Sequence, residues 1–349
     1  MPTCKNVHFS FNLKLSRNRN KIEEALFMTN NQLLGIHHVT AITDDAARNY
    51  KFFTEILGMR LVKKTVNQDD IQTYHTFFAD DVGSAGTDMT FFDFPGIPKG
   101  RKGTNSITKP SFRVPNDDAL EYYLKRFDEY GVEHEGIQTL FGKKVLPFQE
   151  EDGQDYQLVS DEGNTGVAPG KPWKNGPVPE DKAIYGLGPI EITVSYFDDF
   201  KKLLEDIYGM KVVVSEDDVA LLEVGEGGNG GQVILRRDSK SPNAFQGYGE
   251  VHHVSFRVKN HEAIEQWIKK YSEARIPNSG LVDRFYFEAL YARLGHILLE
   301  ISTDGPGFMG DEPYQTLGEK LSLPPFLEEQ RDYIETQVRP FDTTGKSYK

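Results

Sequence analysis

The sequence predicts an α+β protein built from four modules, each with one strand, one helix and three further strands. The chain repeats itself: residues 52–62 resemble residues 203–213, and the string Ser-Phe-Arg-Val at 111–114 recurs at 255–258. Repeats of this length indicate one supersecondary unit that is used several times. The order along the chain is therefore one type of module, a second type, and then both again.

The first module illustrates the pattern. Residues 34–43 alternate as a strand does, and residues 44–57 carry apolar side chains at helical spacing. Asp44 or Asp45 is positioned to cap the start of this helix, and Gly58 to end it. The remaining strands of the module are predicted near residues 60–67, 71–79 and 86–94.

Composition divides the chain into two halves. The stretch 163–189 contains six Gly and five Pro, which disfavour a helix or an interior strand, so a linker is predicted at 163–186. Residues 1–32 are predicted to be a disordered or short helical extension, and residues 305–349 a C-terminal tail. The four modules are expected at 33–95 and 105–162 in the N-terminal half (33–162), and at 187–238 and 249–304 in the C-terminal half (187–304).

Charge and composition narrow the class of function. The chain has 40 Lys and Arg against 53 Asp and Glu, a formal net charge of -13. Phosphate binding needs a surplus of cations, so this charge argues against nucleic acid or an anionic membrane as partner. No stretch is apolar enough to span a membrane, and the single cysteine, Cys4, excludes an internal disulfide and fits a reducing cytoplasm. Association into a homo-oligomer is left open.

Two pairs of histidines carry the strongest chemical signal. His37-His38 and His252-His253 each open a strand-like segment with the same β-branched pattern, and they account for four of the nine histidines. A lone histidine there is more often a hydrogen-bonded core residue, but the repetition favours a metal site. Glu300 lies in the apolar run Ile-Leu-Leu-Glu-Ile, where an unpaired carboxylate is costly to bury. Two imidazoles and one carboxylate form the ligand set of Fe(II) oxygenases. Neighbouring side chains on a strand point to opposite faces, so only one histidine of each pair can reach the metal.

The four modules, the Gly-Met-Arg/Lys-Leu/Val-Val helix exits, the histidine at the head of a module and the glutamate on its last strand resemble the vicinal oxygen chelate superfamily. Residues 61–70, 74–80 and 283–287 further resemble the hydroquinone-cleaving branch of ring-cleaving dioxygenases. The resemblance implies two open β-barrels and an Fe(II) enzyme that opens a small aromatic substrate of hydroquinone type with O2. The cleaved bond would lie between a hydroxylated ring carbon and its neighbour.

The resemblance also implies roles for individual residues. It makes the second histidine of each pair a metal ligand, which gives the set His38, His253 and Glu300. It assigns four residues to the pocket around the metal, as groups that orient or deprotonate the phenol: His37, His252, Arg284 and Tyr291.

The distribution of the ligands along the chain predicts how the modules pair. His38 lies in the first module, whereas His253 and Glu300 lie in the fourth, yet all three must reach one metal ion. The first and fourth modules are therefore expected to pair around the metal, and the second and third to form a metal-free barrel. The rival arrangement pairs one with two and three with four.

Two other functions compete with the dioxygenase. Asp93, in the string Phe-Phe-Asp-Phe, is interpreted as the counterpart of Glu300 in the first module; as a fourth ligand it would indicate a glyoxalase-like lyase or isomerase with a Lewis-acid metal. A non-catalytic binding protein would need no metal, and the second module does have Lys109 and Gln157 where the fourth has His253 and Glu300. Two further histidines, His75 and His296, are expected at the surface or beside the metal ligands.

Overall fold

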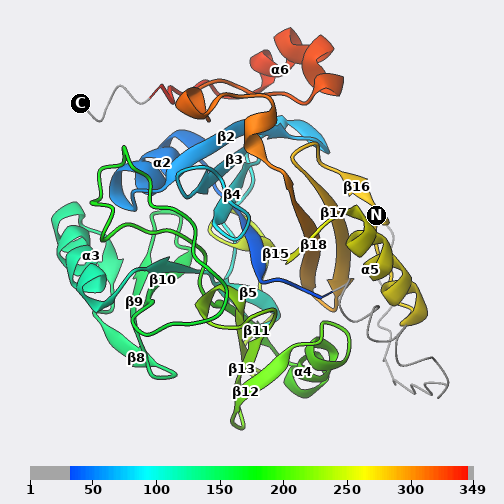
Figure 1. Ribbon diagram of the computed structural model, residues 1–349. Coiled ribbons are helices and arrows are strands. Elements are labelled where there is room, and N and C mark those ends of the chain that lie inside the picture. The colour runs from blue at the N-terminus through cyan, green and yellow to red at the C-terminus, as the bar shows by residue number, and fades with distance from the viewer. Residues whose placement is uncertain (1–31, 345–349) are drawn as a thin grey trace.

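The computed structural model describes residues 32–344, which form three sheets with helices on their outer faces (Figure 1). Residues 1–31, the greater part of the predicted extension, lie outside the described residues. No helix within the described part is long and apolar enough to cross a membrane.

The largest sheet joins the first and fourth modules. Its eight strands lie in the order β16-β17-β18-β15-β1-β4-β3-β2. Their bounds are β1 (Ile36–Ile42), β2 (Arg60–Asn67), β3 (Asp70–Ala79), β4 (Asp88–Asp93), β15 (Val251–Val258), β16 (Val282–Asp283), β17 (Phe287–Leu294) and β18 (Ile297–Pro306). Strand β1 pairs antiparallel with β15 and parallel with β4, so it connects the two modules directly. The predicted pairing of modules one and four is confirmed, and the rival tandem arrangement is wrong.

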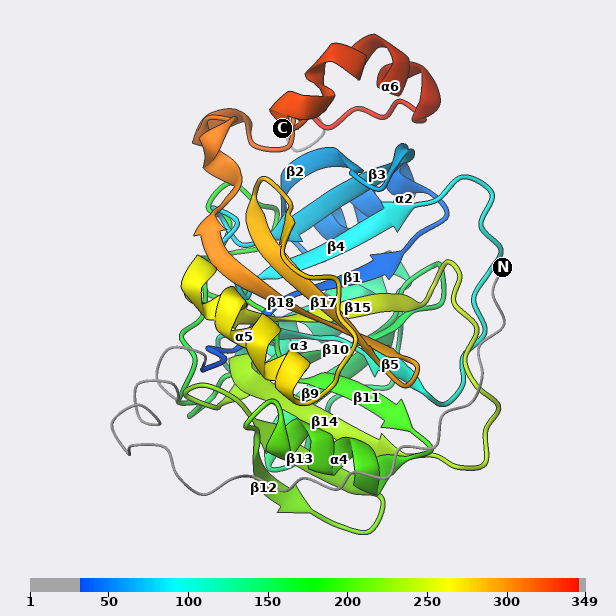
Figure 2. The same cartoon turned by 90° about the vertical axis from the view of Figure 1, so that its right-hand side faces the viewer.

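The second and third modules form two five-stranded sheets below this one (Figure 2). One has the order β6-β10-β9-β7, with β8 paired to β9, and the other has the order β12-β13-β14-β11-β5. Their bounds are β5 (Ser106–Lys109), β6 (Ser111–Val114), β7 (Glu133–His134), β8 (Gln138–Leu140), β9 (Lys143–Gln149), β10 (Asp155–Ser160), β11 (Ile190–Val194), β12 (Lys211–Ser215), β13 (Val219–Glu223) and β14 (Gln232–Arg237).

Pro110 separates two consecutive strands, β5 and β6, that belong to different sheets. It lies between β5, which pairs with β11 of the third module, and β6, which pairs with β10 of its own module. Proline has no N–H to donate to a sheet ladder, so the chain changes partner at this point. This exchange links modules two and three, as the predicted fold of two open barrels requires.

Each module contributes one helix, and the first is capped by Asp45. The carboxylate of Asp45 accepts hydrogen bonds from the backbone N–H groups of Ala47 and Arg48, so the helix begins two residues later than the predicted residue 44. Gly58, with φ +73°, ends the helical segment as predicted. The helices are α2 (Ala46–Lys51, continued by a π-helical turn at Phe52–Ile56), α3 (Asp117–Tyr130), α4 (Phe197–Asp206), α5 (His261–Glu273) and the C-terminal α6 (Arg331–Gln337).

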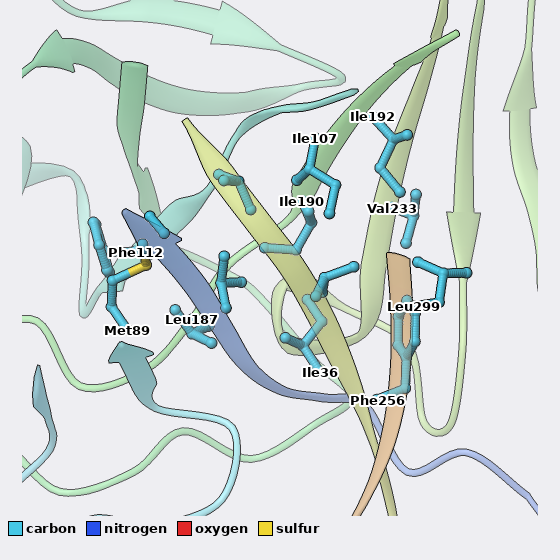
Figure 3. Close-up of a cluster of buried hydrophobic side chains, with 14 of the residues drawn as sticks. Ile36, Met89, Ile107, Phe112, Leu187, Ile190, Ile192, Val233, Phe256 and Leu299 are labelled. Carbon is cyan, nitrogen blue, oxygen red and sulfur yellow. The ribbon is translucent and has the colours of Figure 1, made fainter. Parts of the chain in front are cut away.

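A shared apolar core holds the four modules together. Ile36, Phe112, Ile190 and Leu299, one from each module, belong to a single cluster of buried side chains (Figure 3). Residues 163–186 contain no helix or strand, but several of their apolar side chains are buried in the same core. Burial of this surface is the main force that fixes the modules relative to one another.

The segment after β18 crosses the edge of the large sheet. Leu321 forms a parallel bridge with Lys64 of β2, and the N–H of Ser322 donates to the Lys64 carbonyl at 2.8 Å. The buried Lys63 ammonium forms ion pairs with Asp311 and Glu312. Helix α6 then lies over β2 and β3 (Figure 2). Residues 305–344 therefore cover the outer edge of the eight-stranded sheet.

Candidate metal centre

Three neighbouring strands at the centre of the large sheet bring His38, His253 and Glu300 together. In the sheet register, Thr40 of β1 faces His253 of β15, and Ser255 of β15 faces Glu300 of β18. Glu300 Oε2 lies 2.8 Å from His253 Nε2 and 3.2 Å from His38 Nε2, and the two Nε2 atoms lie 3.2 Å apart. The three predicted ligands thus converge on one point, although 215 residues separate the two histidines.

The chemistry of this cluster fits a divalent metal. Glu300 is fully buried (0% exposed), and its Oε2 has no hydrogen-bond partner despite the two short contacts to ring nitrogens. Burial alone would raise the pKa of Glu300, but the adjacent His38 and His253 hold that pKa well below its ordinary value, so the carboxylate is charged. A buried charged oxygen without a hydrogen-bond donor is costly, and a cation between the three atoms would compensate it. Two imidazole nitrogens and one carboxylate oxygen suit Fe(II) and related metals.

The first histidine of each pair orients the second. His37 Nε2 lies 3.0 Å from the carbonyl oxygen of Thr303, so it carries a proton and donates to that oxygen. His37 Nδ1 must then accept from His38 Nδ1, 2.9 Å away, which leaves the lone pair of His38 Nε2 directed at the metal position. His37 does not line the cavity described below, so its side chain contacts His38 and not the space that a substrate could occupy.

His252 stands in the same relation to His253, but it also lines the cavity. The two Nδ1 atoms are 2.7 Å apart. With a metal on His253 Nε2, His253 Nδ1 is the donor in this contact, and His252 keeps its proton on Nε2. Burial, together with the neighbouring His253, lowers the pKa of His252 to about 3, so the ring is neutral at physiological pH.

A cavity of about 600 Å³ lies next to the three clustered side chains His38, His253 and Glu300. His38 and His253 form part of its wall, together with His252. Aromatic side chains line much of the remainder: Phe77, Phe92, Phe94, Tyr286, Phe287 and Tyr291. The cavity therefore offers flat apolar surfaces next to the metal position, which suits an aromatic ring.

Arg284 and Tyr291 form the polar side of this cavity. The Arg284 Nε donates to the Tyr291 hydroxyl at 3.2 Å, and its Nη2 forms an ion pair with Asp69 at 2.8 Å. Tyr291 lies directly across from Glu300 in the pairing of β17 with β18. Burial and the nearby Glu300 raise the pKa of Tyr291 above its ordinary value, so its hydroxyl remains protonated and can donate a hydrogen bond.

Asp93 is not a metal ligand, and its interpretation as the counterpart of Glu300 is wrong. Its carboxylate forms an ion pair with Arg339 at 2.6 Å. The sheet register instead pairs Thr90 with Thr40, two residues after His38, just as Glu300 pairs with Ser255, two residues after His253. Thr90 therefore occupies the position of a fourth ligand.

The structure also places His75, His296 and Gln157, which the sequence analysis named. His75 lines the cavity, with its ring 4.0 Å from that of Phe77 and 4.5 Å from that of Phe92, whereas His296 is exposed in the turn between β17 and β18. In the second module, Gln157 pairs with Ser111, so it does occupy the position equivalent to Glu300. Among the described residues, His38, His253 and Glu300 form the one group of three or more His, Cys, Asp or Glu side chains close enough to share a metal ion.

Comparison with known proteins places this architecture in a family. Residues 35–157 and 186–304 match the model of the Glyoxalase/Bleomycin resistance protein/Dioxygenase superfamily. The chain belongs to this superfamily. The resemblance predicted from the sequence is therefore confirmed.

Within the superfamily, the chain has relatives that are named as ring-cleaving enzymes. The Bacillus subtilis protein MhqA, named as a ring-cleaving dioxygenase, is 43% identical over 312 residues, which make up 88% of this chain and 98% of that protein. The chlorohydroquinone/hydroquinone 1,2-dioxygenase of Sphingobium indicum is 26% identical over 309 residues, which make up 86% of this chain and 94% of that enzyme.

Solved structures of superfamily members have the same fold. A crystal structure from B. subtilis, named as a dioxygenase, has a TM-score of 0.82 and 34% sequence identity, and covers 89% of this chain and 98% of that chain. Glyoxalase I from Zea mays has a TM-score of 0.56 with 15% identity, and covers 77% of this chain and 92% of that chain. At that identity, the likeness to glyoxalase I concerns the fold alone.

Proposed function

We propose that the protein is an Fe(II)-dependent ring-cleaving dioxygenase that acts on hydroquinone-type substrates with O2. The observation that carries the proposal is the ligand set of two histidines and one glutamate beside an aromatic-lined cavity, with Thr90 where a fourth ligand would stand. The relatives named as ring-cleaving and hydroquinone dioxygenases support the reaction type and the substrate class.

His38, His253 and Glu300 would hold the metal. When bound there, Fe(II) supplies a redox-active centre with coordination positions left open for a phenolic oxygen and for dioxygen. His37 and His252 fix the ring orientation and tautomer of the two ligand histidines through the Nδ1 contacts.

The cavity residues bind and orient the aromatic substrate. Phe77, Phe92 and Phe287 offer apolar faces against which a ring can pack, and they exclude water from its surroundings. His252, neutral and protonated on Nε2, can donate a hydrogen bond to a substrate oxygen. The protonated Tyr291 hydroxyl and the Arg284 guanidinium add donors near Glu300, where they would stabilise negative charge that develops on substrate or dioxygen.

Anaerobic reconstitution with Fe(II), followed by assay of oxygen uptake, tests this function. Hydroquinone, methylhydroquinone and chlorohydroquinone form the substrate panel, with catechol as the control for ring-substitution pattern. We expect one iron per chain, oxygen uptake with the hydroquinones, and a ring-opened product that contains both atoms of O2. Full turnover with Zn(II) in place of iron would favour a glyoxalase-like lyase, and tight binding of the panel without oxygen uptake would favour a non-catalytic binding protein.

A further inference from the structure

Two polar residues of the cavity wall, Thr65 and His75, lie opposite each other on neighbouring strands. Thr65 of β2 pairs with His75 of β3, so their side chains lie on the same face of the sheet. Both residues line the cavity. They form a polar pair beside Phe77 and Phe92, whose rings contact that of His75.

The polar pair has hydrogen-bonding capacity that the protein does not use. Thr65 is 2% exposed, and its hydroxyl oxygen has no hydrogen-bond partner. His75 Nε2 lies 2.9 Å from the Thr90 hydroxyl, and this is the one hydrogen bond of the ring within residues 32–344. His75 Nδ1 is left for another partner. Buried polar groups are normally paired, so two unused groups on one cavity wall indicate a place for a polar group of a ligand.

The polar side chains at the turn between β2 and β3 also line the cavity, but each of them already bonds to the protein. The Gln68 amide donates to the Arg284 carbonyl at 2.8 Å, and Asp69 forms the ion pair with the Arg284 guanidinium. Asn67 accepts from the N–H of Asp69, and Asp70 accepts from the hydroxyl of the threonine three residues later. The polar pair is therefore better prepared to bind a ligand than this turn is.

The polar pair and the ligand histidines lie at different places along the same cavity wall. Strand β4 separates β3 from β1, which carries His38. Two strand spacings correspond to about 10 Å across the sheet. An aromatic ring that binds through one oxygen beside His38 can therefore extend along the sheet face toward β3. A second oxygen at the opposite end of the ring would approach the polar pair, whereas a second oxygen on the adjacent ring carbon would not.

We propose that Thr65 and His75 bind the second hydroxyl of a hydroquinone, at the end of the ring opposite the metal. Burial lowers the pKa of His75 well below its ordinary value, so the ring is neutral and Nδ1 can form a hydrogen bond with an uncharged phenolic hydroxyl. A site that hydrogen-bonds a hydroxyl discriminates strongly against a ligand that lacks it. The inference rests on the proposed function for the class of substrate and for its attachment at the metal.

Calorimetry on Fe(II)-loaded protein without oxygen tests the polar pair, because it measures binding without turnover. The ligands are hydroquinone and 4-methylphenol, which has a methyl group in place of the second hydroxyl. The wild type should bind hydroquinone about 10-fold more tightly, the effect of one typical hydrogen bond. Thr65→Val should lose most of this preference and keep its iron and its affinity for 4-methylphenol. Thr65→Ser, which retains the hydroxyl, should keep the preference.

Two substitutions separate the roles of the His75 nitrogens. The amide of Asn lies near the position of Nδ1, and the amide of Gln near that of Nε2. His75→Asn should therefore keep much of the preference for hydroquinone, whereas His75→Gln, which can still bond to Thr90, should lose it. A role limited to support of Thr90 predicts the reverse order, and that result would overturn the assignment of Nδ1.

Thr76→Val is the matched control, because Thr76 is also a buried threonine with an unpartnered hydroxyl but does not line the cavity. It should bind both ligands as the wild type does. Equal affinity of the wild type for the two ligands would overturn the inference, and so would an unchanged preference in Thr65→Val and His75→Gln. If these variants lose the preference but the wild type consumes no oxygen with hydroquinone in air, the proposed function fails and this inference stands.

Discussion

Thr90 of the first module stands where Glu300 stands in the fourth. Each lies on the last strand of its module, opposite the residue that follows the ligand histidine by two positions: Thr40 in one case and Ser255 in the other. The internal repeat therefore duplicates the histidine but not the carboxylate. The result is a cluster of two imidazoles and one carboxylate, with a threonine where a second carboxylate would complete a four-ligand site.

Thr90→Glu should convert this centre into a four-ligand site. We expect tighter binding of Zn(II) and loss of oxygen uptake, because a second carboxylate would occupy a position that the substrate or dioxygen needs. Thr90→Gln, of similar size but without charge, is the control. Competition with a chelator measures the affinity; unchanged Zn(II) binding together with wild-type turnover would show that Thr90 does not face the metal.

Glu300→Gln should remove most of the metal, because a neutral amide replaces the one anionic ligand. The metal affinity should fall by more than roughly 10–100-fold, which is the usual loss when a residue that hydrogen-bonds to a metal ligand is replaced. Metal analysis after dialysis gives the result. His296→Ala serves as the control, because His296 is exposed and precedes Glu300 by four residues. Stoichiometric iron in Glu300→Gln would exclude Glu300 as a ligand.

His37→Leu should weaken metal binding although His37 reaches neither cavity nor metal position. Its loss leaves the His38 Nδ1–H and the Thr303 carbonyl without their partners, and the His38 ring is no longer fixed. A loss of about 10–100-fold in metal affinity is expected. In His37→Asn, the side-chain oxygen can replace Nδ1 as acceptor, so this variant should retain more metal; equal losses in both would argue against an orienting role.

Arg284→Ala and Tyr291→Phe should keep iron and lower kcat by about 100-fold, as is typical for loss of one donor to a charged transition state. Asp69→Asn should have a smaller effect, because Asp69 is 72% exposed and its ion pair with Arg284 is screened by solvent. Steady-state kinetics on preparations with measured iron content test this. Iron-free protein in either of the first two variants, with folding intact, would show that these residues support the metal instead.

The pH profile of Tyr291→Phe gives a separate test. Burial and Glu300 raise the pKa of Tyr291 above its ordinary value near 10, so the hydroxyl should remain protonated up to at least pH 9. The rates of wild type and variant should therefore differ by a constant factor from about pH 7 to about pH 9. A basic limb present in the wild type and absent in the variant would mean that Tyr291 titrates in this range.

Local signals explain what the sequence could predict. The paired histidines and the buried glutamate are short patterns that need no knowledge of strand register, and their positions in modules one and four are enough to predict which modules pair. The helix start was ambiguous between Asp44 and Asp45 because both precede the apolar pattern, and only backbone geometry selects Asp45.

Register explains what the sequence could not predict. Asp93 resembled Glu300 because both lie in apolar runs, but a shift of three residues along β4 places Thr90 at the equivalent position. His75 had no repeated partner, and its position in the cavity depends on how β3 aligns with β4. Pairing between strands is a long-range property, and one residue of shift moves a side chain to the opposite face.

The C-terminal segment over β2 has a consequence for how the chain folds. Lys64 of β2 donates to the carbonyl of Phe341, 277 residues later, and Leu321 supplies the neighbouring backbone contact. Until that distant segment is made and docks, β2 is an open sheet edge with unpaired N–H and C=O groups, which can recruit a strand from another chain. Contacts so far apart in sequence form slowly. The nascent protein is therefore most prone to aggregate after its eight-stranded sheet has formed and before residues 305–344 cover the edge of that sheet.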